Sequence, residues 1–138
     1  MVTKSALETL AWAEAFSTRL RSGDVVCLSG ELGAGKSVVA KGIGRGLGVK
    51  EEILSPTFNY VLEYHGREAL FHADLYRLED ANSFIALGLE EYFERDGIFL
   101  IEWPERIAEL LPQNCYHIHL DILPNLSERS ILVSEPRT

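Results

Sequence analysis

Long hydrophobic runs are missing from this chain of 138 residues. Unbroken apolar stretches such as 25–28 and 98–101 are far shorter than the roughly 20 residues that a membrane-spanning helix needs. The N-terminus, Met-Val-Thr-Lys-Ser-Ala, also lacks the apolar segment of a secretory signal peptide. We therefore expect no membrane partner and a cytoplasmic location.

Basic side chains are scarce as well. Thirteen Lys and Arg residues stand against 21 Asp and Glu residues, which gives a net charge of −8. Tight, sequence-independent binding to nucleic acid draws most of its energy from basic side chains on phosphates. Direct tight binding to RNA or DNA is therefore a poor first expectation, although a local basic patch stays open.

Cysteine is represented by only two residues, Cys27 and Cys115, which lie far apart in the sequence. A disulfide between them stays open, but a reduced pair of core thiols is the favoured interpretation. The sequence has no Cys-x-x-Cys or His-x-x-x-His spacing, so nothing in the spacing indicates a structural metal.

The composition, with 46% apolar and 25% charged residues, is that of a soluble globular protein, and the length fits one domain over residues 1–138. Helical and strand patterns alternate along most of the chain, which predicts an α/β fold with a mainly parallel sheet flanked by helices. The last two strands are expected to form a C-terminal antiparallel pair. Helices are predicted over 5–21, 36–47, 80–94 and 104–111, and strands over 24–28, 60–64, 68–75, 97–103, 116–122 and 130–134.

The strongest chemical signal is the segment Gly-Glu-Leu-Gly-Ala-Gly-Lys-Ser at 30–37, which fits the phosphate-loop pattern G-x-x-x-x-G-K-[ST]. Glycines let the backbone N–H groups approach an anion, and the following helix directs its positive end to the same place. Lys36 is expected to reach the β- and γ-phosphates and Ser37 to offer its hydroxyl to Mg²⁺. The pattern therefore predicts a nucleoside triphosphate site in a P-loop NTPase fold.

A second glycine series follows at Gly42, Gly44, Gly46 and Gly48. It does not match G-x-G-x-x-G and falls within or after a helix rather than after a strand. We interpret it as close helix packing and not as a dinucleotide site.

Two acidic residues stand at the ends of predicted strands, where ligands bind in open α/β sheets. Glu102 is the expected second ligand of Mg²⁺, and the alternative is a surface acid at a strand end. Asp74 is expected to orient water or support the metal, and the alternatives are a helix N-cap or a salt bridge to Arg77. His72 shares a strand face with Asp74, and a structural role for this histidine is the favoured interpretation.

Three further features are weaker signals. Thr57, in the loop Ser-Pro-Thr-Phe at 55–58, carries a hydroxyl that could close over a nucleotide. Trp103 lies next to the predicted metal ligand, either as core or as a docking surface. His117, His119 and Asp121 alternate along a strand, which is more typical of a solvated face than of a ligand cluster.

Four motifs in this order resemble the TsaE family of bacterial ATPases, formerly called YjeE: 30–37, Ser-Pro-Thr-Phe at 55–58, His-Ala-Asp-Leu-Tyr-Arg-Leu at 72–78 and Ile-Glu-Trp-Pro at 101–104. The resemblance implies a small cytoplasmic ATPase needed for N6-threonylcarbamoyladenosine formation in tRNA. It implies the TsaB–TsaD complex as partner, with tRNA held mainly by that complex. Hydrolysis is expected to be slow for the chain alone and faster with the partners.

The resemblance also implies residue roles. Ser37 and Glu102 hold Mg²⁺; Asp74, Glu102 and Thr57 support catalysis; and Thr9 lies close to the adenine. Ser37 replaces the threonine more usual in the family, which keeps the hydroxyl, and the segment after Pro124 matches no family motif. The nucleotide-binding residues expected on this basis are Thr9, Gly33, Ala34, Gly35, Lys36, Ser37, Val38 and Trp103, with ATP as ligand and ADP as product.

Two functions of other classes stay open. A small-molecule kinase usually carries a lid with several arginines, whereas the arginines here are scattered. A non-catalytic nucleotide-sensing subunit would share every residue discussed and differ only in turnover. A GTPase is disfavoured because the sequence has no Asn-Lys-x-Asp motif. The arginines weighed against the kinase are Arg67, Arg77, Arg95, Arg106 and Arg129.

Overall fold

A computed structural model describes residues 1–56 and 59–136 of the chain. One sheet runs through the described part in the strand order β1-β7-β6-β2-β5-β4-β3. Its strands are β1 (Val2–Thr3), β2 (Val25–Ser29), β3 (Val61–His65), β4 (Ala69–Asp74), β5 (Ile98–Glu102), β6 (Tyr116–Ile122) and β7 (Arg129–Ser134). The α-helices are α1 (Ala6–Phe16), α2 (Lys36–Gly46) and α3 (Ala81–Ala86), and the 3₁₀ helices are η1 (Ser17–Arg19), η2 (Leu89–Phe93) and η3 (Pro104–Leu110).

The sheet is mixed, with a parallel centre. Strands β6, β2, β5 and β4 pair in parallel, whereas β3 pairs with β4, β7 with β6 and β1 with β7 in antiparallel fashion. The predicted α/β fold with flanking helices and a C-terminal antiparallel pair is confirmed. The parallel register aligns the carboxyl ends of β4 and β5, so that Asp74 lies opposite Glu102.

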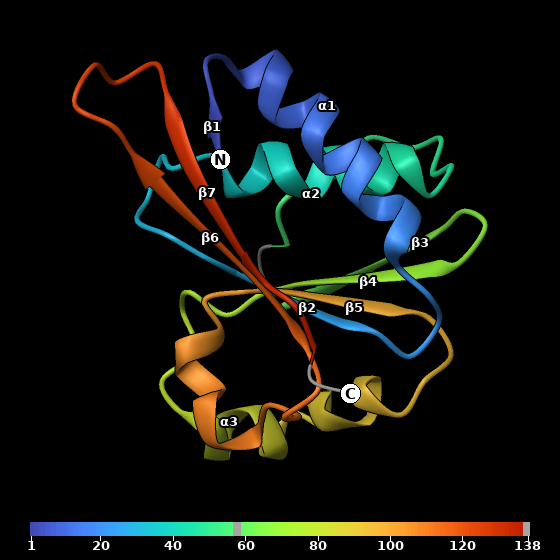
Figure 1. The fold of residues 1–138 in the computed structure, drawn as a ribbon. Coiled ribbons are helices and arrows are strands. Elements are labelled where there is room, and N and C mark those ends of the chain that lie inside the picture. Colours follow the sequence, from blue (N-terminus) through green and yellow to red (C-terminus); the bar gives the residue numbers. More distant parts are fainter. Residues whose placement is uncertain (57–58, 137–138) are drawn as a thin grey trace.

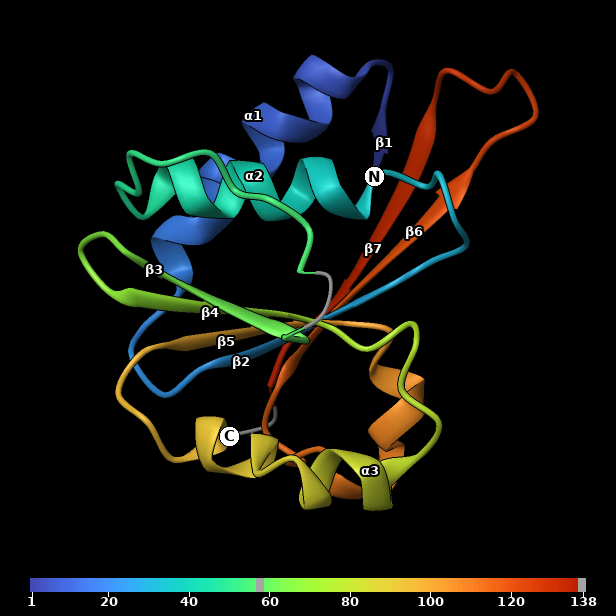
Figure 2. The same ribbon diagram turned by 180° about the vertical axis from the view of Figure 1, so that it is seen from behind.

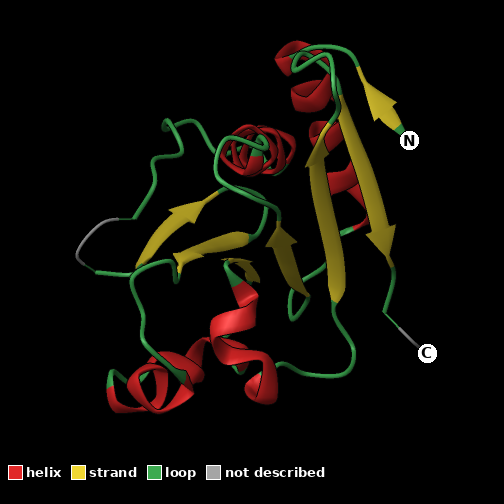
Figure 3. Cartoon of the chain, turned by 90° about the vertical axis from the view of Figure 1, so that its left-hand side faces the viewer, coloured by secondary structure: helices red, strands yellow, loops and turns green. Residues whose placement is uncertain are grey.

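Helices cover both faces of the sheet (Figures 1 and 2). Helices α1 and α2 lie on one face together with η1, and α3 lies on the other face with η2 and η3, which the side view of Figure 3 separates clearly. Alternate residues of β2 point to opposite faces of the sheet. Val26 and Leu28 pack in the core between the sheet and helices α1 and α2, whereas Val25 and Cys27 pack in the core on the other face. This two-sided burial explains why the central strands read as unbroken apolar runs.

The interpretation of the second glycine series as close helix packing is confirmed for the contact between α1 and α2. A Cβ on Gly42 would lie 2.5 Å from Ala13 Cβ and 2.6 Å from Leu10 O. A Cβ on Gly46 would lie 2.6 Å from Glu14 O. Both neighbours include main-chain atoms of α1, so any side chain larger than hydrogen would push the two helices apart.

Two predicted helices differ from the observed ones. The helix predicted over 5–21 is α-helical to Phe16 and continues only as the short 3₁₀ helix η1. The helix predicted over 80–94 is wrong as a single element, because Gly88 adopts φ +74° between α3 and η2. A left-handed glycine ends an α-helix, and here it outweighs the apolar periodicity of the segment.

Strand β1 was absent from the prediction. It has two residues, too few to show an alternating pattern, and it exists because Val2 and Thr3 pair with Ser130 and Arg129 of β7. This pairing places the N-terminus beside the β6–β7 hairpin (Figure 1).

Cys27 and Cys115 are both buried and free, as the preferred interpretation of the sequence predicted. Across residues 1–56 and 59–136, no helix is both long and apolar enough to cross a membrane.

Candidate nucleotide-binding site

The phosphate loop connects the end of β2 to the start of α2, and the predicted strand–loop–helix context is confirmed. Gly30, Gly33 and Gly35 have φ values of +145°, +84° and +108°, a region that favours glycine. Gly30 is also constrained by space, since a Cβ there would lie 2.6 Å from Leu120 O of β6. The motif glycines are therefore required by the shape of the loop.

Helix α2 begins directly at Lys36 and is capped by Gly35, whose lack of a side chain leaves the first turn without a side-chain acceptor. The N-terminal N–H groups of a helix carry partial positive charge and bind anions when no side chain occupies them. The start of α2 thus offers backbone donors at the mouth of the pocket.

Lys36 is folded back over the loop that precedes it. Its side chain is 6% exposed, and Nζ donates a hydrogen bond of 2.5 Å to Gly30 O. The ammonium also lies 3.8 Å from the centre of the Trp103 ring, a cation–π contact. Burial lowers the pKa of Lys36, and the nearby carboxylates of Glu102 and Asp74 oppose that shift.

Trp103 lies at the pocket and in contact with the lysine, not in the closed core. It follows β5 with φ +60°, an uncommon conformation for a non-glycine residue, and it caps η3. Its ring packs against Tyr76 with centroids 4.9 Å apart. The unusual backbone turn directs the indole over Lys36.

The two strand-end carboxylates lie side by side on neighbouring parallel strands. Glu102 is 5% exposed, so the alternative of a surface acid is wrong. Asp74 accepts a hydrogen bond of 3.0 Å from Tyr76 N, while the N-cap of α3 is Asp80 instead. Burial raises the pKa of Asp74, and the negative charge of Glu102 adds to this effect.

His72 contacts Glu102 directly. Its Nε2 lies 2.6 Å from Glu102 Oε2, with both side chains buried, so the ring orients the carboxylate. Among the described residues, His72 Nδ1 is buried without a hydrogen-bond partner. If Nε2 carries the proton, Nδ1 is an acceptor that faces no donor within residues 1–56 and 59–136.

These elements surround a pocket of about 390 Å³. Thr9 lines it, but its hydroxyl already bonds Thr3 Oγ1 at 2.6 Å and Ser5 O at 3.2 Å. Ala34 is fully buried beneath the loop, and Thr57 lies outside the described residues. The candidate residues that the structure brings together around the pocket are Thr9, Gly33, Gly35, Lys36, Ser37, Val38, Asp74, Glu102 and Trp103.

Arg129 was not identified as a site residue from the sequence, where it was one of several scattered arginines. It begins β7 and lines the same pocket, with Nε donating to Ala34 O at 3.0 Å and Nη2 to Gly33 O at 3.4 Å. The same guanidinium donates to Leu126 O at 2.8 Å. These bonds hold the β6–β7 hairpin against the phosphate loop. The two segments are about a hundred residues apart in the sequence, so no local motif predicts the contact.

Comparison with known proteins agrees with this geometry. The family model described as threonylcarbamoyl adenosine biosynthesis protein TsaE matches residues 3–131. A TsaE protein of Treponema pallidum is 41% identical over 133 residues, covering 96% of this chain and 98% of its own length. A TsaE protein of Bacillus subtilis is 45% identical over 107 residues, covering 77% of this chain and 66% of its own.

A solved structure shares the fold. The crystal structure of Bacillus subtilis YdiB superposes with a TM-score of 0.83 at 36% identity, covering 99% of this chain and 84% of that one. The resemblance seen in the four motifs thus extends over nearly the whole chain. The chain belongs to the TsaE family.

Proposed function

We propose that this chain is a Mg²⁺-dependent ATPase that serves N6-threonylcarbamoyladenosine formation in tRNA. The observation that carries the proposal is the convergence of the phosphate loop, Lys36 and two strand-end carboxylates on one pocket. The relatives from Treponema pallidum and Bacillus subtilis are both named as tRNA threonylcarbamoyladenosine biosynthesis proteins, which supports the biological role.

Lys36 is the proposed ligand of the β- and γ-phosphates. In the described state its ammonium rests on Gly30 O and on the Trp103 ring. A phosphate oxygen is a stronger acceptor than a neutral carbonyl, because the hydrogen bond is then ionic on both sides. Nucleotide binding therefore draws Lys36 away from the indole and changes the environment of Trp103.

Ser37 and Glu102 are the proposed holders of Mg²⁺. The donor set suits the ion, which prefers hard oxygen ligands and keeps several waters. His72 contacts one oxygen of Glu102, which leaves the other oxygen for the metal or its water. Bound Mg²⁺ would supply neutralisation of the charge on the phosphates.

Asp74 is the proposed residue that orients the attacking water. It is adjacent to Glu102 in register, and one of its oxygens is fixed by Tyr76 N, so its direction is set before a nucleotide arrives. Its raised pKa favours holding a proton more than an ordinary aspartate does. Phosphoryl transfer depends mainly on such positioning and on charge stabilisation. Thr57 remains the sequence-based proposal for a loop that closes over the site.

The proposed partner is a TsaB–TsaD complex, and the proposed location is the cytoplasm. The net charge of −8 supports a division of labour in which the partner complex, rather than this chain, holds the tRNA. A kinase is less well supported, because Arg129 is the one arginine among the described residues that line the pocket.

The test separates binding from turnover. The chain has two tryptophans, and Trp12 stacks on Phe16 in α1 away from the pocket lining. A Trp12→Phe variant therefore reports Trp103 alone. We expect its fluorescence to change on titration with ATP and Mg²⁺, and phosphate release to rise when TsaB–TsaD is added.

Matched variants assign the roles. Lys36→Ala and Glu102→Ala should abolish turnover, whereas Lys41→Ala on the exposed side of the same helix and Glu109→Ala in η3 should not. A fluorescence change without phosphate release, with or without partners, would favour the nucleotide-sensing subunit. No fluorescence change and no release would overturn the proposal.

A further inference from the structure

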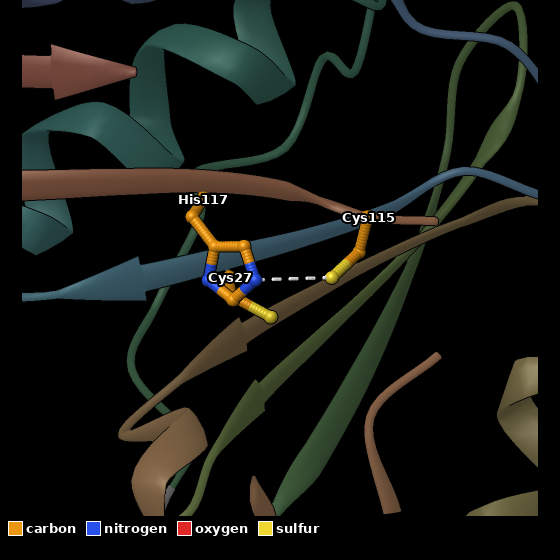
Figure 4. Close-up of side chains that lie close together, drawn as sticks. All are labelled: Cys27, Cys115 and His117. Carbon is orange, nitrogen blue, oxygen red and sulfur yellow. Dashed lines mark hydrogen bonds between the residues drawn. The ribbon is translucent and has the colours of Figure 1, made fainter. Parts of the chain in front are cut away.

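Three metal-ligating side chains meet on the other side of the sheet from the phosphate pocket. Cys27 lies in β2, Cys115 directly precedes β6, and His117 lies in β6. Their Sγ and imidazole nitrogen atoms all lie within 4.8 Å of one another (Figure 4). The cysteines are buried and the histidine is exposed.

The parallel pairing of β2 and β6 creates this cluster. The register sets Cys27 opposite His117, so their side chains leave the sheet on the same face. Cys115 is two residues before His117 and shares that face, because side chains alternate along a strand. Its Sγ donates to Pro112 O at 3.2 Å and lies 3.2 Å from His117 Nε2. The sequence showed no metal spacing because the three ligands come from two strands.

The spacing of the backbone does not favour a disulfide between Cys27 and Cys115. Strands about 4.8 Å apart with a rise of about 3.3 Å per residue put the Cα atoms of Cys27 and Cys115 about 8 Å apart, given their two-residue offset. Disulfides need Cα atoms within about 7 Å. A metal ion has no such requirement, because it sits between its ligands.

We propose that Cys27, Cys115 and His117 form a binding site for a zinc ion. Ligand atoms in tetrahedral zinc sites lie about 3.5–3.8 Å apart, given bonds of about 2.3 Å to sulfur and 2.0–2.1 Å to nitrogen. The three ligand atoms here lie within 4.8 Å of one another, with Cys115 Sγ 3.2 Å from His117 Nε2, which is close to that spacing. Two thiolates and an imidazole select zinc over Mg²⁺ or Ca²⁺.

The site offers three protein ligands, which leaves a fourth position for water. The exposed edge of His117 supplies the route by which the ion enters. Since the ligands join β2 to β6, the bound ion would also tie together two strands of the parallel centre of the sheet. The site is independent of the proposed nucleotide function, because none of its residues lines the phosphate pocket.

The experiment is a titration of the full chain, under a non-thiol reductant, with Co²⁺ and then with Zn²⁺. Cobalt bound by thiolates gives a charge-transfer absorption that oxygen ligands do not give. We expect one equivalent of Co²⁺ to produce this band, Zn²⁺ to displace it and Mg²⁺ to leave it unchanged.

Variants locate the ligands. His117→Ala and Cys115→Ser should weaken zinc binding by about 100-fold or more, since even outer contacts of metal sites change affinity by about 10–100-fold. His119→Ala is the matched control: it lies on the same strand face but bonds Ser29 and Asp121, and zinc affinity should be unchanged. Circular dichroism of each variant checks that it folds. Absence of the thiolate band in the wild type, or equal affinity in His117→Ala, would overturn the proposal.

Discussion

Arg129 offers a strong test of the pocket, because replacing it separates a structural contribution from a binding contribution. We consider Arg129→Met, which keeps much of the apolar stem and removes the charge and the donors. The variant loses the hydrogen bond of 3.0 Å to Ala34 O and the longer one of 3.4 Å to Gly33 O. The phosphate loop then loses its fastening to the β6–β7 hairpin.

The bonds of Nη1 to Leu126 O and Glu128 O stay within the hairpin and are lost as well, so the two contacts to the loop set a lower bound on the magnitude. A hydrogen bond to a charged group contributes about 1.5–3 kcal/mol, and partial exposure of Arg129 places the first contact near the low end. The second contact is long and adds little. A loss of about 1.5 kcal/mol lowers the melting temperature of a domain of this size by roughly 5 °C. Because Arg129 lines the pocket, we also expect its guanidinium to contact a bound phosphate, and a loss of the same size there weakens nucleotide binding about tenfold.

The assays are thermal unfolding and the Trp103 fluorescence titration with ATP and Mg²⁺. Arg129→Lys keeps the charge but not the forked donors, so it should recover part of the affinity and little of the stability. Arg67→Met is the matched control, because Arg67 Nη2 donates to Ser17 O at 2.7 Å, away from the pocket. The control should lose stability and keep its nucleotide affinity. Unchanged melting and unchanged affinity in Arg129→Met would refute the reasoning.

Three further predictions concern stability. Because burial raises the pKa of Asp74 above its unfolded value, the stability linked to its protonated form is present at acid pH and lost as pH rises through the folded pKa. In urea unfolding, Asp74→Asn should therefore have a higher free energy of unfolding than the wild type at neutral pH and an equal one near pH 3. The same difference in free energy at both pH values would contradict this. Gly42→Ala should lower the free energy of unfolding by about 1–2 kcal/mol, because a clash with Leu10 O outweighs a helix-propensity gain of about 1 kcal/mol. Increased stability there would show that the helices can separate freely. His72→Ala should cost about 2–4 kcal/mol in urea unfolding, since it leaves Glu102 buried without its partner. A loss below 1 kcal/mol would mean that the pair does not hold the carboxylate.

The site residues that the sequence predicted are those whose place follows from the order of neighbouring strands and helices. The phosphate loop lies between one strand and one helix, and Asp74 and Glu102 each end a strand, so a single parallel sheet brings them together. Arg129 could not be predicted in this way. Its place depends on the turn and register of the last hairpin, which sets a strand residue against the loop carbonyls.

In the fold, too, elements with a local sequence pattern were predicted, and elements that depend on tertiary pairing or on one backbone conformation were not. The buried central strands have continuous apolar patterns because both faces are covered, and these strands were predicted. Strand β1 has no pattern of its own and forms only because β7 offers a free edge. The segment 80–94 kept a helical apolar pattern, yet Gly88 turns into the left-handed region and divides it. A single backbone conformation there overrides the periodicity of many side chains.

Strand β2 connects the two proposed sites while keeping them on opposite faces. Leu28 pairs with Glu102 and packs on the side of α1 and α2, whereas Cys27 packs in the opposite core. The strand ends at Ser29, one residue after Leu28, and the phosphate loop follows. Since neighbouring residues of a strand point to opposite faces, losing Lys36 or Glu102 should leave the cobalt band intact, and losing His117 should leave nucleotide binding intact. If any one of these three variants lost both the cobalt band and nucleotide binding, the strand itself, rather than a single side chain, would have moved.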